Sequence, residues 1–200
     1  MDEATLIGFA KEGDLDAFNR LVLTYQDMVF TQACRLLNDE QAADDASQEA
    51  FISAYKNIRK YRGGSFRAWL LRIVTNTCYD ELRRRKRKPT TPLEPLDDTG
   101  DEVESPGWMA DPGETPEEAY ERSELGGVLR DCIKKLPVDF QTVVYLIDVQ
   151  GLDYNEVSVI IGKPLGTVKS RLARARLRLR DCLQGNRELL PGKFRLKSEV

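Results

Sequence analysis

Residues 153–180 read DYNEVSVIIGKPLGTVKSRLARARLRLR, and this stretch decides the fold of the C-terminal part of the chain. Asp153 and Glu156 have the spacing of a capping box, which predicts the start of a short helix. Gly162 predicts the end of that helix, and Pro164 can occupy the first turn of the next one. The stretch therefore predicts two helices joined by a tight turn, with the second helix strongly basic.

One further helix is predicted immediately upstream, opened by Leu136-Pro137 and closed by Gly151. In the final helix the apolar positions recur in steps of four and three, as a buried face requires. These positions are Val168, Leu172, Ala175, Leu179 and Cys182. Three short helices of this kind, the last one cationic, are typical of a helix-turn-helix DNA-binding domain.

The final helix carries a dense row of cations, and no acidic residue occurs from Val157 through Arg180. A helix fits the major groove of B-form DNA, where Arg and Lys side chains reach guanine O6 and N7. The first turns usually meet base edges, and later turns meet phosphates. We therefore expect base contacts from Lys169, Ser170, Ala173 and Arg174, and phosphate contacts from Arg171, Arg176 and Arg178. A solvated basic face without a ligand is the alternative.

Three longer helices are predicted in the N-terminal part of the chain. The first follows an N-cap at Asp14, and its apolar face is Leu15, Phe18, Val22, Tyr25, Val29, Ala33 and Leu36. The second follows Asn38, and its apolar side is Ala42, Ala46, Ala50, Ala54 and Ile58. The third has Ser65 as its N-cap, stops before Pro89, and is expected to bury Phe66, Trp69, Leu70, Ile73 and Thr77.

The polar side of the second helix is a candidate docking surface. It carries Asp44, Asp45, Gln48 and Glu49, which point away from the alanines and have no basic residue at i+4 to neutralise them. This face is either solvated or docks a basic helix of a partner protein. A metal site is a third option, but the histidine or further inward-facing acid that would support it is missing.

The third helix offers a second candidate surface for nucleic acid. Its exposed side recurs at helical spacing as Arg72, Asn76, Asp80, Arg83 and Arg87. Upstream, residues 57–64 mix cations with Tyr61, a combination that single-stranded DNA binding uses. A solvated helix face followed by an ordinary basic tail is the alternative.

Residues 89–121 hold eleven acidic residues and no Lys or Arg, although the net charge of the chain is only −3. Prolines are frequent there and large apolar residues are scarce, so we expect an extended linker in which Trp108 and Met109 can dock on a partner. The chain is thus expected to be all-α with two small domains. They are an N-terminal helical bundle (1–88) and a C-terminal helix-turn-helix (122–186), joined by the acidic linker (89–121) and followed by a short tail (187–200).

The composition argues against most enzymes. The 200 residues include no histidine, which removes Ser-His-Asp catalysis and histidine-containing zinc sites. The four cysteines form no C-x-x-C pair, so we expect Cys34, Cys78, Cys132 and Cys182 to be reduced core thiols. The N-terminus does not resemble a signal peptide and no apolar run reaches membrane length, so we expect a cytoplasmic protein without membrane insertion. We expect no catalytic residue, no metal and no cofactor.

Three segments together resemble a known protein family. They are Asp44-Asp45-Ala-Ser-Gln48-Glu49-Ala-Phe51, Phe66-Arg-Ala-Trp69-Leu70-x-Arg72-Ile73-x-x-Asn76-x-x-x-Asp80-x-x-Arg83, and Gly166-Thr167-Val168-Lys169-Ser170-Arg171-Leu172-x-Arg174-Ala175-Arg176. In this order and spacing they resemble the extracytoplasmic-function sigma factors, group IV of the sigma-70 family, over roughly residues 5–184. Ser47 and Ser158 depart from the family pattern, which more often has an aliphatic residue and Ala there.

The resemblance implies a transcription initiation factor that binds core RNA polymerase and directs it to promoter DNA. It implies that the largest polymerase subunit, beta-prime, is contacted by Asp44, Asp45, Gln48 and Glu49. It assigns melting and reading of the minus-ten promoter element to the loop at 57–65, which includes Arg62, and to Arg72, Asn76, Asp80 and Arg83. It assigns the minus-thirty-five element to Thr167, Lys169, Ser170, Arg171, Ala173, Arg174 and Arg176.

The resemblance also implies partners beyond the promoter. The C-terminal domain would touch the flap of the beta subunit, and the acidic linker would run through the positively charged RNA exit path. An anti-sigma factor would hold the protein inactive until a stress signal releases it.

Two other classes of function stay open on the residues alone. A repressor or activator would use the same helix-turn-helix, but it explains neither the N-terminal helices nor the linker, and it should not co-elute with core polymerase. An adaptor that works only through the acidic helix would keep its function after charge reversal across Arg171, Arg174 and Arg176.

Overall fold

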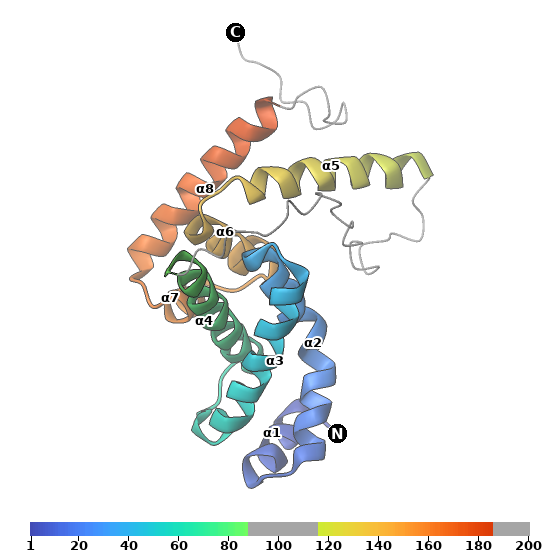
Figure 1. Cartoon of the computed structure of the whole chain (residues 1–200), viewed down its shortest axis with the longest axis vertical. Helices are drawn as coiled ribbons and strands as arrows, with labels where there is room; N and C mark the ends of the chain where they lie inside the picture. Colours follow the sequence, from blue (N-terminus) through green and yellow to red (C-terminus); the bar gives the residue numbers. More distant parts are fainter. Residues whose placement is uncertain (88–115, 186–200) are drawn as a thin grey trace. The chain divides into compact units, whose positions relative to one another are not determined.

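The computed structural model describes residues 1–87 and 116–185, and Figure 1 shows these residues as helices joined by turns. Within these two ranges every regular element is helical and no strand occurs, which confirms the predicted all-α class. The chain divides into two compact units: residues 1–89 with 142–172, and residues 90–141 with 173–200. Trp108, Met109 and the tail at 187–200 lie outside the described residues, as does most of the predicted linker.

The first unit starts with a helix that the apolar pattern did not predict, α1 (Glu3–Glu12). Asp2 caps it, because its carboxylate accepts a hydrogen bond of 3.0 Å from the Thr5 N–H. Leu6, Ile7 and Ala10 are buried, and α1 packs on α2. The apolar run is too short to show a helical period by itself, so periodicity along the chain does not indicate this helix.

Helix α2 (Leu15–Leu37) confirms the predicted first long helix and its cap. The Asp14 carboxylate accepts hydrogen bonds from the N–H groups of Asp16 and Ala17, at 2.9 and 3.1 Å. The predicted apolar face was wrong for Leu15, which is 54% exposed because it stands at the very start of the helix. The buried side chains are Ala17, Phe18, Leu21, Val29, Gln32, Ala33, Leu36 and Leu37.

Helix α3 (Glu40–Asn57) is lined on its inner side by small residues, which let it pack closely against both α2 and α4. The prediction placed Ala42 in this stripe, but Ala43 is the fully buried residue and Ala42 lies at the edge. Ser47 is also buried, and its hydroxyl donates a 2.7 Å hydrogen bond to the Ala43 carbonyl. This polar side chain is therefore satisfied inside the core.

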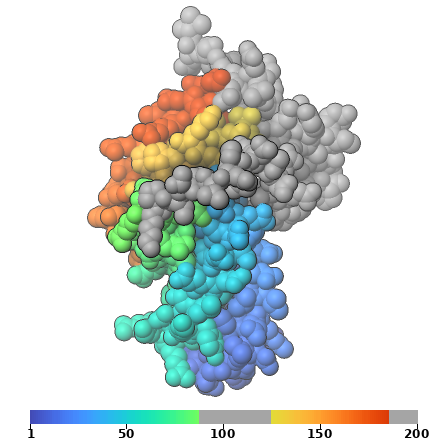
Figure 2. Space-filling model, in the orientation of Figure 1, coloured from blue at the N-terminus to red at the C-terminus, as the bar shows by residue number. Residues whose placement is uncertain are grey.

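Helix α4 (Phe66–Arg87) begins after Ser65, whose hydroxyl accepts a 3.1 Å hydrogen bond from the Ala68 N–H, as the predicted cap requires. Its buried side chains are Phe66, Leu70, Leu71, Val74, Thr75 and Cys78. Trp69, Ile73 and Thr77, which were expected in the core, are only half-buried. The buried stripe is turned because α4 packs on three helices, α2, α3 and α7. In Figure 2 the blue and cyan atoms of α1–α3 form one continuous packed surface.

The remainder of the first unit holds the tight turn that was predicted between the two helices of residues 153–180. Asp153 and Glu156 form the capping box of α7 (Tyr154–Ile161), and Gly162 ends this helix with a φ of 61°. Helix α8 (Leu165–Gly185) starts directly after Pro164, whose carbonyl accepts a 2.9 Å hydrogen bond from the Thr167 N–H. The predicted upstream helix consists of α6 (Val138–Val144) and a π-helical turn, η3 (Tyr145–Val149).

The second unit contains α5 (Pro116–Lys134) and the C-terminal half of α8. Helix α5 begins at Pro116, a residue suited to a first helical turn, so it starts within the segment expected to be linker. Cys132 of α5 and Cys182 of α8 form a disulfide, with their Cα atoms 5.8 Å apart. The expectation of reduced thiols was wrong for this pair, because the fold brings together two residues 50 positions apart in the sequence. Cys34 and Cys78 are free.

Candidate nucleic-acid interface

Helix α8 presents an exposed polar row next to its buried apolar row. Val168, Leu172 and Ala175 are at most 2% exposed, so they hold the helix on the domain. The residues between them point outward, as the helical period requires. Lys169, Ser170, Ala173, Arg174 and Arg176 are exposed, while Thr167 and Arg171 are half-buried. The structure thus brings all seven predicted residues to one helix with their side chains at least partly accessible.

Two aromatic side chains lie close to the cations of α8. The Lys169 Nζ atom is 5.9 Å from the ring centroid of Tyr154, and the Arg178 guanidinium is 5.0 Å from that of Phe140. These distances lie within the range of cation–π attraction, which orients the long side chains without removing them from solvent. Neither contact could be read from local spacing, because each aromatic residue lies on another helix.

The candidate row on α4 is also exposed. Arg72, Asn76, Asp80, Arg83 and Arg87 all face solvent. The Arg83 Nη1 atom lies 2.9 Å from the Asp80 Oδ1 atom, and the two side chains are 67% and 73% exposed. An ion pair this exposed contributes little to stability, so Arg83 can leave Asp80 for another anion at low cost.

The loop before α4 differs from the prediction. Arg62 is exposed, but Tyr61 is only 7% exposed, so it cannot serve as a stacking platform for bases. Its ring centroid lies 5.4 Å from that of Phe66 and 5.3 Å from that of Trp69, and its hydroxyl donates a 2.6 Å hydrogen bond to the Gly64 carbonyl. Burial raises the pKa of Tyr61. Tyr61 is therefore a core residue that fixes the turn ahead of α4.

The acidic face of α3 points outward. Asp44, Asp45, Gln48 and Glu49 are exposed, and the Gln48 amide donates a 2.8 Å hydrogen bond to Asp44. Asp45 and Glu49 also line one wall of a groove of about 630 Å³, and Asn76 and Asp80 of α4 line the other wall. Two surfaces that the sequence suggested separately therefore share one groove.

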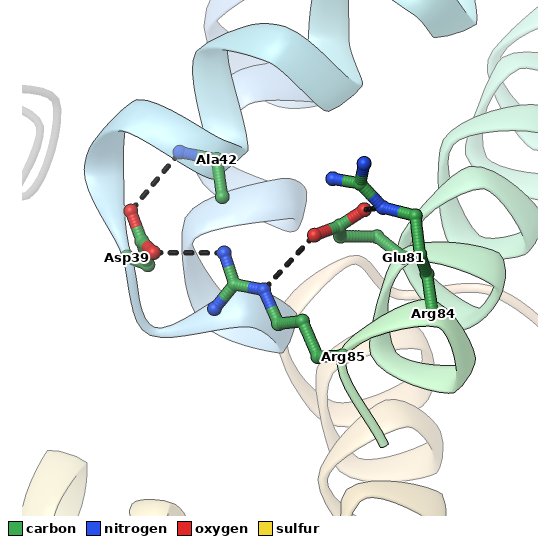
Figure 3. A network of polar contacts seen from close by, with 5 residues as sticks. All are labelled: Asp39, Ala42, Glu81, Arg84 and Arg85. Carbon is green, nitrogen blue, oxygen red and sulfur yellow. Dashed lines mark hydrogen bonds and ion pairs between the residues drawn. The ribbon is translucent and has the colours of Figure 1, made fainter. Parts of the chain in front are cut away.

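A hydrogen-bonded network at the end of this groove joins α3 to α4 (Figure 3). The Asp39 carboxylate accepts from the Ala42 N–H at 3.0 Å and from the Arg85 guanidinium at 2.8 Å. Glu81 accepts from Arg84 at 2.7 Å and from Arg85 at 3.0 Å. The Ala42 N–H and then Arg85 lower the pKa of Asp39, and the bonds from Arg84 and Arg85 lower the pKa of Glu81. Sequence reasoning missed this network, because Asp39 and Arg85 are distant in the chain.

Neither a membrane-spanning helix nor a metal-binding cluster occurs within residues 1–87 and 116–185. In these ranges, no helix combines the length and apolar character needed to cross a bilayer. The same part of the chain has no group of three or more His, Cys, Asp or Glu side chains arranged to hold a metal ion.

Two family models match the chain. Residues 21–88 match the model described as Sigma-70 region 2, and residues 127–179 match the model described as Sigma-70, region 4. The first match contains the acidic face of α3 and the exposed row of α4. The second contains α7 and the exposed row of α8.

Sequence relatives and a solved structure agree with these matches. The chain is 37% identical over 169 residues to the ECF RNA polymerase sigma factor SigE of Mycolicibacterium smegmatis, covering 84% of this chain and 62% of that longer protein. It is 37% identical over 175 residues to the ECF RNA polymerase sigma factor SigW of Bacillus subtilis, covering 87% of this chain and 92% of that one. Its fold resembles the sigma factor RpoE of Bartonella quintana, solved in complex with the anti-sigma factor NepR. That match has a TM-score of 0.62 and 25% identity, and it covers 84% of this chain and 98% of the other.

Proposed function

Because the chain belongs to the extracytoplasmic-function group of the sigma-70 family, we propose that its two sets of helices divide promoter recognition between them. The protein is a sigma factor, which binds core RNA polymerase and promoter DNA to initiate transcription. The proposed domains are residues 1–88 and 122–186, linked by 89–121 and followed by a tail at 187–200. The two family matches, which fall within the two proposed domains, support this division.

We assign recognition of the minus-thirty-five element to α8. The observation that carries this assignment is the exposed row of Lys169, Ser170 and Arg174 beside a buried row on the same helix. Lys169 and Arg174 have the donors that guanine O6 and N7 accept, and Ala173 leaves room for a base edge or a thymine methyl group. Thr167, Arg171 and Arg176 complete the contact, with the arginines on phosphates.

We assign the minus-ten element to α4 and to the loop before it. Asn76 can hydrogen-bond an unpaired base edge, and Arg62, Arg72 and Arg83 can hold the strand through its phosphates. The exposure of these side chains supports the assignment. Asp80 lies in the same row and can accept a hydrogen bond from a base amino group.

We assign polymerase docking to the acidic face of α3. Asp44, Asp45, Gln48 and Glu49 form a compact set of exposed acceptors, which suits a basic helix on the polymerase beta-prime subunit. The helix-turn-helix domain would contact the beta subunit, and the acidic linker would follow the RNA exit path, where its charge imitates nucleic acid.

Regulation by an anti-sigma factor completes the proposal. The Bartonella quintana relative was solved with such a partner, and its likeness to this chain supports the same mode of control here. A sigma factor works beside RNA polymerase, so we place the protein in the cytoplasm as an alternative, stress-responsive factor. We assign it no enzymatic activity of its own.

In vitro transcription with core polymerase on a library of randomised promoters tests the whole assignment. The full chain should co-elute with core polymerase and enrich two short sequence blocks separated by a fixed spacing. A Lys169→Ala, Arg174→Ala variant should lose selection in the upstream block only. Failure to co-elute with core polymerase, or enrichment of a single block by the wild-type chain, would contradict the proposal.

A further inference from the structure

The disulfide between α5 and α8 is the feature that the proposed function does not explain. Cys132 is 1% exposed, whereas Cys182 is half-buried and stands one turn beyond Arg178 on α8. In Figure 2 the yellow atoms of α5 adjoin the orange atoms of α8, on the helices that this bond joins. The bond thus fixes the C-terminal end of the same helix that carries the proposed DNA contacts.

A disulfide is unusual in the compartment where a sigma factor works. Glutathione and thioredoxin keep cytoplasmic thiols reduced, so a disulfide found there is usually transient and redox-sensing. Small secreted domains need disulfides to make up for a small core, but here the unit that holds the disulfide already buries Ile133, Leu136, Ala175 and Leu179. A purely structural disulfide therefore fits this place poorly.

We propose that Cys132 and Cys182 form a reversible redox site that controls DNA binding by α8, an inference that rests on the proposed function. Peroxide is the oxidant class, and a dithiol protein of the thioredoxin class is the reductant. The oxidised site holds the C-terminal half of α8 against α5. The reduced site releases it.

The other two cysteines do not compete for this role. Burial raises the pKa of Cys78 to about 12, and it also raises the pKa of Cys34. Because the thiolate is the reactive form, both side chains react slowly near neutral pH. They offer an internal control within the same chain.

The chemistry balances in both directions. In oxidation, the Cys182 thiolate attacks the peroxide O–O bond and becomes a sulfenic acid, with release of one water after proton uptake. The Cys132 thiol then attacks that sulfur, forming the S–S bond and releasing a second water. In reduction, a thiolate of the dithiol attacks the sulfur of Cys182, the less buried of the two residues, and displaces the Cys132 thiolate, which takes a proton. The second thiol of the reductant then closes its own disulfide and frees Cys182.

The effect on DNA follows from the position of the bond. Beyond Ala175, α8 is held by the buried Leu179, by the contact of Arg178 with Phe140, and by the disulfide. Without the bond the last turns are freer to fray, and Arg176 and Arg178 lie in or next to those turns. The reduced form should therefore lose phosphate contacts while its base-reading residues stay in place.

The test uses the full chain, equilibrated with peroxide or with excess dithiothreitol. Thiols are counted by maleimide labelling under denaturing conditions, and melting temperature and the affinity for a short mixed-sequence DNA duplex are measured. Reduction should raise the labelled thiols from two to four, as the four cysteines and one disulfide require. It should lower the melting temperature by on the order of 10 °C and weaken DNA binding by about three- to tenfold. Cys34→Ser, Cys78→Ala should respond like wild type, and Cys182→Ser should behave as reduced under both conditions.

The possible failures are distinguishable. A pair that resists dithiothreitol, or oxidised and reduced forms that bind DNA equally, would overturn the redox proposal and leave the proposed function standing. In another outcome, the Cys132–Cys182 disulfide is reversibly reduced and the melting temperature shifts, but the chain binds no DNA in either form. That outcome would contradict the proposed DNA-binding role of α8 and, with it, the redox control of DNA binding.

Discussion

Helices α4 and α8 each carry an exposed row of basic residues beside a buried face, but their acidic neighbours differ. On α4, Asp80 pairs with Arg83 at 2.9 Å, and Glu81 accepts from both Arg84 and Arg85. On α8, the sequence from Val157 through Arg180 contains no acid at all. The positive field of α4 is therefore partly neutralised by its own side chains, and that of the first turns of α8 is not.

This difference separates two ways to bind DNA. A cationic helix with no acid in its own first turns attracts duplex phosphates over a distance, and it gains much of its affinity from counterion release. A helix whose cations are already paired gains less in that way, and its contacts depend more on short-range hydrogen bonds such as those Asn76 offers to a base. We thus expect α8 to supply affinity for the duplex and α4 to act where bases are already exposed.

The largest expected effect separates polymerase docking from DNA binding. Asp45→Lys with Glu49→Lys replaces attraction by repulsion on the acidic face of α3, so affinity for core polymerase should fall by on the order of 100-fold or more. Duplex binding through α8 should be unchanged, because both substitutions lie on α3 and none lies on α8. Glu12→Lys with Asp27→Lys changes the charge equally at exposed sites on α1 and α2, and this control should bind polymerase normally. Retained binding by the α3 variant, measured by co-elution and with helicity checked by circular dichroism, would remove the docking role.

The next effect concerns base recognition by α8. Lys169→Ala and Arg174→Ala should each cost about 1–3 kcal/mol in binding of the selected minus-thirty-five sequence, because each removes donors to a base edge. Binding to a scrambled duplex should change less. Arg180→Ala serves as the control, because Arg180 is exposed on the same helix and already pairs with Asp181 at 3.1 Å. Equal losses on both sequences would show phosphate contact in place of base reading.

A smaller effect tests the contrast in charge directly. Arg178→Gln should reduce the slope of log affinity against log salt by about 1 on duplex DNA, as loss of one phosphate contact requires. Arg83→Gln should change the slope less on a forked promoter DNA, because the nearby Asp80 carboxylate already neutralises part of the Arg83 charge. The slopes come from titrations at several salt concentrations. Equal changes in the two variants would break the comparison between α4 and α8.

The smallest effect comes from the carboxylates that end the α3–α4 groove. The pKa values of Asp39 and Glu81 are lowered from ordinary values of 3.8 and 4.5. Their contribution to folding stability is therefore complete above the ordinary values and is lost as the pH falls through the lowered ones. Arg85→Gln should make the loss of melting temperature below about pH 4.5 shallower, with an effect under about 1 kcal/mol because the Arg85 and Asp39 side chains are 39% and 40% exposed and screened by solvent. An unchanged acid profile in Arg85→Gln would show that the network adds no stability.

Local signals in the sequence predicted the helices well where a cap stood beside a periodic run. Asp14, Ser65 and the pair Asp153–Glu156 each mark a helix start that the structure confirms. The exposure of Lys169 on α8 also followed from the period alone, since a buried row fixes where the opposite row points.

Features that depend on tertiary contacts could not be predicted from the sequence. Tyr61 looked like an accessible aromatic residue among cations, but its ring is covered by Phe66 and Trp69. The Cys132–Cys182 bond needed the packing of two helices that no local pattern specifies. The groove between α3 and α4 was missed for the same reason, because spacing along one helix does not reveal which neighbour it faces.

Asp39 has a consequence for how the two surfaces of the groove can move. One oxygen of this side chain begins α3 through Ala42, and the other holds the last turns of α4 through Arg85. If one helix slid along the other, a hydrogen bond at this carboxylate would break. Asp39 therefore links the start of α3 to the last turns of α4 at one end of the groove. A partner docked on α3 would therefore bind a helix that is tied to the one carrying Asn76 and Asp80, so the proposed polymerase contact and the proposed minus-ten contact lie on two helices joined at this carboxylate.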